Sequence, residues 1–173
     1  MRMMFKKEFI TETIKTVLIA FVLAFLLIKF IMVPCVVEGT SMYPILQEND
    51  FGYSFIITRN IKIDRFDIVV IQVGDEENSK LLVKRVIGLP NETITYTDNK
   101  LYINGEYIEE SFLNSSVLTN DFTVTINDDE YFCLGDNRPL SRDSRFYGAF
   151  NKEDILSTHM FVIYPFKDFG LKD

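Results

Sequence analysis

The stretch EGTSMYPIL (residues 38–46) lies where the chain changes from one long apolar run to a series of short segments typical of β-strands. Within it, Gly39 and Pro44 bracket Ser41, and both residue types favour turns because glycine allows unusual backbone angles and proline fixes φ. A hydroxyl group held on such a turn can face a cleft. Most Ser-x-x-Pro stretches are ordinary surface turns, so this pattern alone leaves both interpretations open.

Residues 14–33 precede this stretch and form the only apolar run of membrane length. At about 1.5 Å per helical residue the run spans roughly 30 Å, the thickness of a hydrocarbon core. It is apolar on all sides, which fits a core helix with one apolar face poorly. Its end, IMVPCVV, lacks the small residues of a cleavage site, so a retained transmembrane anchor is predicted.

The basic residues predict the orientation of this anchor. Four of them precede or open the run, whereas no Lys or Arg occurs between residues 30 and 58. The positive-inside rule therefore places residues 1–13 in the cytoplasm and the body of the chain outside.

Composition and charge narrow the classes of partner. The chain has 173 residues, of which 47% are hydrophobic, and this is ample for a core. The net charge is −7, but the first 33 residues carry +3, so the remainder carries −10. Such an acidic body argues against nucleic acid as a partner. Cys35, Cys133 and the single histidine, His159, are too few for a structural zinc site, and the sequence does not decide whether the cysteines pair.

Beyond the anchor, short segments rich in branched and aromatic residues predict an all-β body of antiparallel sheets. The segments are FGYSFII (51–57), FDIVVIQV (66–73), LLVKRVIGL (81–89), TITYT (93–97), KLYI (100–103), EYI (106–108), DFTVTI (121–126), YFCLG (131–135) and HMFVIYPF (159–166). Asn104-Gly105 is a two-residue hairpin signal. Residues 91–129 are predicted to form a small β-hairpin subdomain, inserted into a core made of residues 34–90 and 130–173.

A nucleophilic Ser41 would need a partner that takes its proton. His159 lies in an apolar run, where a structural role is the more common one. Lys84 is the better candidate because LLVKRVIGL is otherwise nearly all apolar, and full burial can lower a lysine pKa by about 3 to 5 units. A neutral amine can then act as a general base. The alternative is that Lys84 and Arg85 are charges on an edge strand that discourage aggregation.

The stretch GDNRPLSRDSRFYG (residues 135–148) is polar and has a glycine at each end. Its DNR and DSR motifs each set an aspartate two residues before an arginine, which suits ion pairs that fix a loop. Ser141, between the motifs, is placed to hydrogen-bond a neutral lysine and orient it. A polar surface turn is the alternative reading of this stretch.

In order and spacing, these stretches resemble the bacterial type I signal peptidases, which are membrane-anchored serine proteases with a Ser-Lys dyad, and in length the short Gram-positive members. The likeness covers nearly the whole chain through VVEGTSMYPIL, LQENDF, FDIVVI, KRVIGLPNE, YINGEYIEESFL and GDNRPLSRDSRFYG. It implies a signal-peptidase/LexA-like β fold behind one transmembrane helix, without metal or organic cofactor.

The resemblance also implies an activity and its setting. Signal peptides would be removed from secreted preproteins after Ala-x-Ala through an acyl-enzyme. The expected partners are these preproteins, membrane lipid and a nearby secretion translocon, and no nucleic acid is expected. The protein would be a single-pass protein of the cell membrane, with its catalytic domain outside the cytoplasm.

Carried over by position, Ser41 corresponds to the nucleophile and Lys84 to the general base. The residues that correspond to supporting positions are Ser141, Asp143, Arg145, Asp136 and Arg85, with Arg145 as the ion partner of Asp143 and Asp136 placed to pair with Arg85. The residues that correspond to the walls of the substrate pockets are Val37, Met42, Leu46, Leu82 and Val83. The substrate would bind extended, as an added strand beside the segments before Ser41 and Lys84.

Two departures from the family pattern stand out. Some members carry an oxyanion-binding hydroxyl two residues before the nucleophile, and that position is Gly39 here. The Ser41 N–H remains a donor, and Gly39 or Thr40 is the candidate for the second. Two glycine-aspartate pairs of the family are Asn49-Asp50 and Asn91-Glu92 here, and asparagine tolerates the backbone region that glycine prefers.

Two other functions are compatible with part of this sequence pattern. Self-cleaving Ser-Lys repressors share the dyad but are soluble and bind DNA, which the anchor and the acidic body disfavour. A membrane-anchored β module that only binds peptides or assists pilus assembly would not need Ser41, Lys84, Ser141 and Asp143 together, and all four are present.

Overall fold

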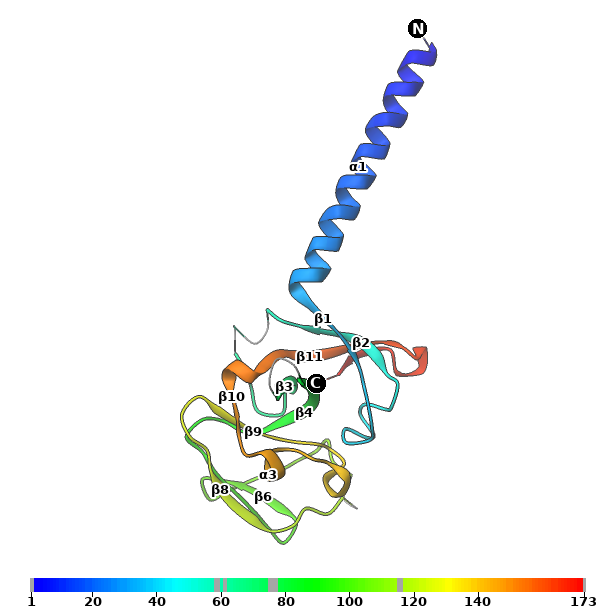
Figure 1. Cartoon of the computed structure of the whole chain (residues 1–173). Coiled ribbons are helices and arrows are strands. Elements are labelled where there is room, and N and C mark those ends of the chain that lie inside the picture. The colour runs from blue at the N-terminus through cyan, green and yellow to red at the C-terminus, as the bar shows by residue number, and fades with distance from the viewer. Residues whose placement is uncertain (1, 58–59, 61, 75–77, 115–116, 173) are drawn as a thin grey trace. The chain divides into compact units, whose positions relative to one another are not determined.

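The computed structural model describes residues 2–57, 60, 62–74, 78–114 and 117–172. The chain separates into two compact units, Met1–Met32 and Val33–Asp173. Figure 1 traces the single helix of the first unit and the strands of the second.

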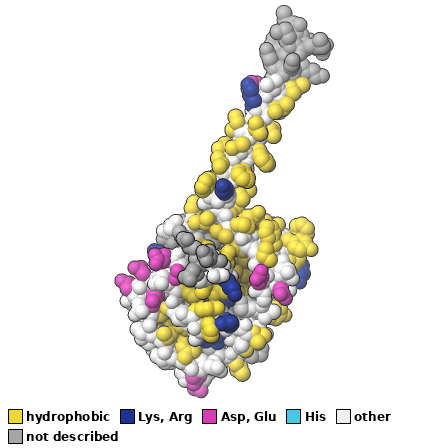
Figure 2. Space-filling view, in the orientation of Figure 1, with side chains coloured by type: hydrophobic (Ala, Val, Ile, Leu, Met, Phe, Trp, Pro, Cys, Tyr) yellow, Lys and Arg dark blue, Asp and Glu magenta, His cyan; other side chains and the backbone are white. Residues whose placement is uncertain are grey.

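The first unit is the helix α1 (Arg2–Ile31). Its segment Phe9–Ile31 has 23 residues and is long and apolar enough to cross a membrane. Hydrophobic side chains line much of the face of this helix that Figure 2 shows, and their exposure is unfavourable in water and favourable in lipid. The helix ends at Ile31, two residues before the end expected from the sequence, because Met32 and Val33 begin strand β1 (Met32–Val36).

Most strands of the second unit form one eight-stranded sheet in the order β1-β2-β11-β3-β4-β9-β10, with β12 paired to β11. Besides β1 they are β2 (Phe51–Phe55), β3 (Ile68–Val73), β4 (Lys80–Gly88), β9 (Glu130–Leu134), β10 (Phe150–Asn151), β11 (Ile155–Tyr164) and β12 (Gly170–Lys172). The pairings of β11 with β2, β3 and β12, of β4 with β3 and β9, and of β9 with β10 are antiparallel.

A second sheet has the order β7-β6-β5-β8 and lies within the chain segment from Thr93 to Thr125. Its strands are β5 (Thr93–Thr97), β6 (Lys100–Ile103), β7 (Glu106–Ile108) and β8 (Phe122–Thr125), all antiparallel. Asn104 and Gly105 both have positive φ between β6 and β7, as the hairpin signal predicted. The subdomain boundaries at residues 91 and 129 stay a prediction.

The all-β class and the strands expected from the sequence are confirmed, but some elements were not predicted. Strand β11 begins at Ile155, four residues before the expected start. Strands β1, β10 and β12 and the single-turn helix α3 (Ser144–Tyr147) were also missed. The short elements have too few residues for a hydrophobic period, and β1 continues the apolar run of the helix.

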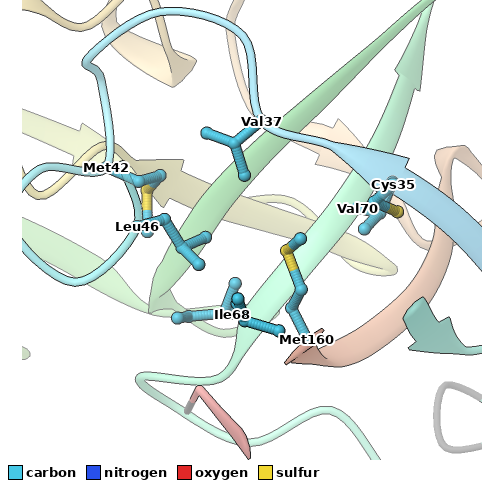
Figure 3. Packing of buried hydrophobic residues seen from close by; sticks show 8 residues of the cluster. Cys35, Val37, Met42, Leu46, Ile68, Val70 and Met160 are labelled. Carbon is cyan, nitrogen blue, oxygen red and sulfur yellow. The ribbon is translucent and has the colours of Figure 1, made fainter. Parts of the chain in front are cut away.

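Buried side chains hold the two ends of the Ser41 turn against the large sheet. Val37 precedes the turn, Met42 and Leu46 follow it, and all three pack with residues of β3 and β11 such as Ile68 and Met160. Figure 3 shows these side chains converging from the loop and the strands. The turn is therefore anchored by the core on both sides of the serine.

A separate cluster joins the two sheets. Ile87, Phe132 and Leu134 from the large sheet pack with residues of the small sheet, including Ile94 and Leu101. The cysteines belong to two other clusters, where Cys35 and Cys133 are both buried and free, so they form no disulfide with each other.

The junction between the sheets gives a stability prediction. Ile94 is fully buried, so Ile94→Ala should remove its packing and lower the free energy of unfolding by about 2 to 5 kcal/mol. Leu118 is 68% exposed, and Leu118→Ala should change that free energy by less than about 0.5 kcal/mol. Denaturant titration of the detergent-solubilised chain measures both values. Equal effects of the two substitutions would contradict the packing described for Ile94.

Candidate active site

Ser41 is fixed on its turn by hydrogen bonds as well as by the packed residues beside it. Within the turn, the Tyr43 N–H donates to the Thr40 carbonyl at 3.1 Å. From the other side, Asn137 donates its backbone N–H to the Ser41 carbonyl (3.0 Å) and its side-chain amide to the Thr40 carbonyl (3.1 Å). These bonds connect the Ser41 turn directly to the GDNRPLSRDSRFYG loop.

Lys84 reaches Ser41 from the middle of β4. Its Nζ lies 2.7 Å from Ser41 Oγ and donates a second hydrogen bond to the Val83 carbonyl at 2.8 Å. Lys84 is only 3% exposed. The structure therefore places the amine and the hydroxyl in direct contact, in surroundings that exclude most water.

Burial also sets the protonation of the amine. It lowers the pKa of Lys84 to about 8, and the negative charges of Asp143 and Asp136 oppose this shift. The neighbouring Cys133 thiol adds no charge near neutral pH, because burial raises its pKa. A large fraction of Lys84 is therefore neutral at mildly alkaline pH and able to accept a proton.

Asp143 organises the loop behind Lys84. It is completely buried and receives two hydrogen bonds of 2.8 Å from the Arg145 guanidinium, together with one of 3.0 Å from the Gly135 N–H. Burial alone would raise the pKa of Asp143, but the hydrogen bonds from Arg145 and Gly135 and the nearby Ser141 hydroxyl hold it below its usual value. Asp143 is therefore an anion whose charge is largely balanced by Arg145.

The second ion pair of the loop reaches across to β4. Arg85 binds Asp136 through two hydrogen bonds of 2.9 and 2.8 Å, and both side chains are 2% exposed. Arg85 also donates to the Phe66 carbonyl at 2.8 Å. Since Arg85 directly follows Lys84, this pair ties the loop to the strand that carries the amine.

Ser141 does not bond Lys84 as the sequence suggested. Its hydroxyl is buried and makes no well-formed hydrogen bond within the described part of the chain, although it lies close enough to Asp143 to help lower its pKa. A Cβ atom on Gly135 would collide with Ser141 Oγ and with the Ser41 carbonyl. The absence of a side chain at position 135 therefore allows the Ser141 hydroxyl and the Ser41 carbonyl to lie close to the backbone of Gly135.

The oxyanion candidates are backbone groups of the Ser41 turn, where Gly39 and Thr40 are exposed and Ser41 is partly buried. The Ser41 N–H donates no hydrogen bond among the residues that the structure describes, so it is free for a substrate oxygen. Gly39 has φ +77 and open space around it, and Thr40 is exposed. The choice between Gly39 and Thr40 as the second hydrogen-bond donor to the oxyanion stays a prediction.

A cleft of about 710 Å³ contains Ser41 and Lys84. The pocket residues expected from the sequence line it, apart from Leu46, which is fully buried beneath the turn and packs in the core. Lys80 to Lys84 of β4 pair with β3 on one edge, while β9 pairs with β4 only from Arg85 onward. The other edge of β4 is thus open toward the cleft in the described part of the fold. His159 does not line the cleft.

Sequence reasoning missed the buried cation Arg138. The DNR motif taken alone suggested that Arg138 pairs with Asp136, but Asp136 binds Arg85, as the family resemblance implied. Arg138 instead binds Glu110 at 2.5 Å and the Tyr96 hydroxyl at 2.5 Å. Arg138 also donates to the Gly135 carbonyl at 3.1 Å. It therefore links the loop of Ser141 to the region of the small sheet, a long-range contact that the local spacing does not reveal.

Three further residues of the loop line the cleft and were also missed, namely Leu140, Arg142 and Tyr147. Among the described residues, no group of three or more His, Cys, Asp or Glu side chains is arranged to hold a metal ion.

Comparison with known proteins gives one consistent family. The model described as "Signal peptidase, peptidase S26" matches residues 10–164. Signal peptidase I S of Bacillus subtilis (strain 168) is 41% identical, with 94% of each chain covered. Signal peptidase IB of Staphylococcus aureus (strain COL) is 31% identical, with 95% of this chain and 94% of the relative covered.

Among solved structures, a signal peptidase I from Enterococcus faecalis V583 matches with a TM-score of 0.49 and 35% identity. The match covers 56% of this chain and 96% of that one.

The Arg138 network gives a second prediction. Glu110→Ala leaves the buried Arg138 guanidinium without its carboxylate, which should lower the free energy of unfolding by about 3 to 5 kcal/mol. The adjacent Glu109 is exposed, and Glu109→Ala should have almost no effect. Denaturant titration of both variants makes the comparison. A Glu110→Ala variant as stable as Glu109→Ala would show that the ion pair is not needed to hold the loop.

Proposed function

The chain belongs to the peptidase S26 family of signal peptidases, and from this premise we propose that Ser41 and Lys84 are the dyad that cleaves signal peptides from secreted preproteins. Membership makes the protein a serine peptidase of the signal peptidase I type. The observation that carries the proposal is the 2.7 Å contact between Ser41 Oγ and the buried amine of Lys84.

In the proposed acylation step, the neutral Lys84 amine accepts the Ser41 hydroxyl proton as Oγ attacks the carbonyl carbon of the scissile bond. The Ser41 N–H donates a hydrogen bond to the oxyanion that forms. Breaking the C–N bond moves the Lys84 proton to the departing amine, which becomes the N-terminus of the mature protein. The signal peptide remains as an ester on Ser41.

Deacylation reuses the same groups. Lys84 takes a proton from a water molecule, whose oxygen attacks the ester carbonyl carbon. The bond to Ser41 Oγ breaks, the proton returns to Oγ, and the signal peptide leaves with a free carboxylate. The chemistry of both steps needs a lysine that is neutral in part, and a pKa of about 8 supports this role.

The loop of residues 135–148 contributes to the lowered pKa of Lys84. A bare carboxylate beside Lys84 would favour the ammonium form, raise the pKa of the amine and leave less of it neutral near pH 8. Because Arg145 binds both oxygens of Asp143, much of that negative charge is offset. We assign Asp143 and Arg145, together with Ser141, Asp136 and Arg85, the role of positioning the amine.

The substrate is proposed to bind as an extended strand along the open edge of β4. The cleft wall there includes Val37 and Met42, which are buried in the core, and the partly buried Val83. These apolar walls support a preference for small apolar side chains such as the alanines of Ala-x-Ala.

The N-terminal helix supports a membrane location. We propose that its apolar segment Phe9–Ile31 anchors the protein in the cell membrane, surrounded by lipid, with the basic N-terminus in the cytoplasm. The catalytic core of residues 34–90 and 130–173, with the inserted residues 91–129, would then lie outside. A neighbouring translocon would deliver preproteins to it.

Removal of either dyad member should abolish cleavage. Ser41→Ala and Lys84→Met should each lower the turnover of a preprotein in detergent by roughly 10⁴-fold or more. The double variant should be no slower than the single ones, because the two groups act in the same steps. Exposed Ser111 and Lys100 give the matched controls Ser111→Ala and Lys100→Met, which should keep full activity. Normal turnover by either dyad variant would disprove the assignment.

The pH dependence follows from the pKa of Lys84. Since the neutral amine is the active form, kcat/KM should rise with pH and reach half of its plateau near pH 8. Below that pH it should fall about ten-fold per unit. Cleavage rates between pH 6 and pH 10 measure this limb. A rate that keeps rising to an inflection near the ordinary lysine pKa, or that shows no dependence, would contradict a buried amine as base.

A further inference from the structure

The catalytic cleft has a wall that the dyad mechanism does not use. Leu140, Arg142 and Tyr147 line the same cleft as Ser41 and Lys84, and all three are exposed. The Arg142 guanidinium stacks over the Phe146 ring at 4.1 Å and lies 5.9 Å from the Tyr147 ring centre. Stacking of this kind holds the guanidinium in place without neutralising its charge.

Arg142 also differs from the other arginines of its loop in its partners. Arg138 and Arg145 each bind a carboxylate, whereas no carboxylate lies within 4.0 Å of Arg142 among the residues that the structure describes. The surrounding body carries a net charge of −10, so Arg142 is a local cation on an acidic protein. It is free to bind an anion that enters the cleft.

The two faces of β4 show where this cation lies along a bound peptide. Val83 packs on the cluster of Val37 and Met42, which forms the side with the small pockets. Leu82 points to the opposite face and packs on a cluster that contains Phe150. The Tyr147 ring lies 6.2 Å from the Phe150 ring, so the wall that contains Arg142 belongs to the Leu82 side.

An extended peptide beside β4 would present its side chains alternately to these two sides. If the two small residues before the scissile bond occupy the Val83 side, the residue between them faces the Leu82 side. Leu82 lies two residues before Lys84 along β4, so in a peptide that runs parallel to β4 this position is upstream of the bond that Ser41 attacks. The middle residue of Ala-x-Ala therefore faces the aromatic and cationic wall.

We propose that Arg142, held by Phe146 and Tyr147, forms a subsite that favours an acidic side chain at the middle position of the cleavage motif. The inference rests on the proposed function, because it needs a peptide bound along β4. An ion pair at an exposed site is weak, and the preference for glutamate over lysine should be roughly two- to five-fold.

The test uses the full-length chain in detergent and one preprotein with Glu, Gln or Lys at the middle position. We expect the wild type to give kcat/KM values in the order Glu, Gln, Lys. Arg142→Gln should remove the difference, Arg142→Glu should reverse it, and raised salt should weaken it. Lys100→Glu makes the same change of net charge on β6, away from the cleft, and should leave the order intact.

The possible outcomes separate the two proposals. Cleavage of all three preproteins with an order that Arg142→Glu does not change overturns the subsite and leaves the dyad standing. An equal change in Lys100→Glu assigns the effect to overall charge and also overturns the subsite. If the wild type cleaves none of the three, nor the parent preprotein, the proposed function fails and the subsite fails with it.

Discussion

The low-dielectric surroundings of the Lys84 amine are the constraint on which the rest of the site depends. A lysine in water keeps its proton at neutral pH and cannot accept another one, so its burial in the middle of β4 is what makes it a base. That burial requires closely packed neighbours around Lys84, since one edge of β4 is open to the cleft at this point. The packing that stabilises the fold is therefore also what keeps part of the Lys84 amine neutral.

The loop of residues 135–148 has to be rigid because it closes this environment. Two bidentate ion pairs, Arg85 with Asp136 and Asp143 with Arg145, connect it to the strand and to itself. Arg138 adds a third connection toward the small sheet through Glu110 and Tyr96. Such buried pairs add little net stability compared with apolar residues, but breaking one leaves an uncompensated charge, so they favour a single loop conformation. The small sheet thereby supports a site that it does not itself contact.

Much of this arrangement was predictable from the sequence because its signals are local. Strand patterns, the Asn104-Gly105 turn and the asparagines at positions 49 and 91 with positive φ follow from backbone preferences of individual residues. A charged residue in an apolar strand made Lys84 a candidate partner of Ser41, and the family resemblance decided between this reading and an edge-strand charge. The partner of Arg138, the core position of Leu46 and the absence of a bond between Ser141 and Lys84 depend on contacts between distant segments. Spacing along the chain carries no information about these contacts. Arg142 escaped notice for a similar reason, since nothing in its neighbours indicates that it borders a cleft.

The Ser41 hydroxyl and the Lys84 amine are brought into contact by the fold itself. In an enzyme with this geometry, the same packing that stabilises the domain also assembles the reactive pair. Whether another protein is cut would then depend on its access to the cleft. Only a segment that is unfolded, lies along the open edge of β4 and carries small side chains could reach Ser41. The shape of the cleft would then select the substrate, and the contact between Ser41 and Lys84 would be the same for every peptide that enters.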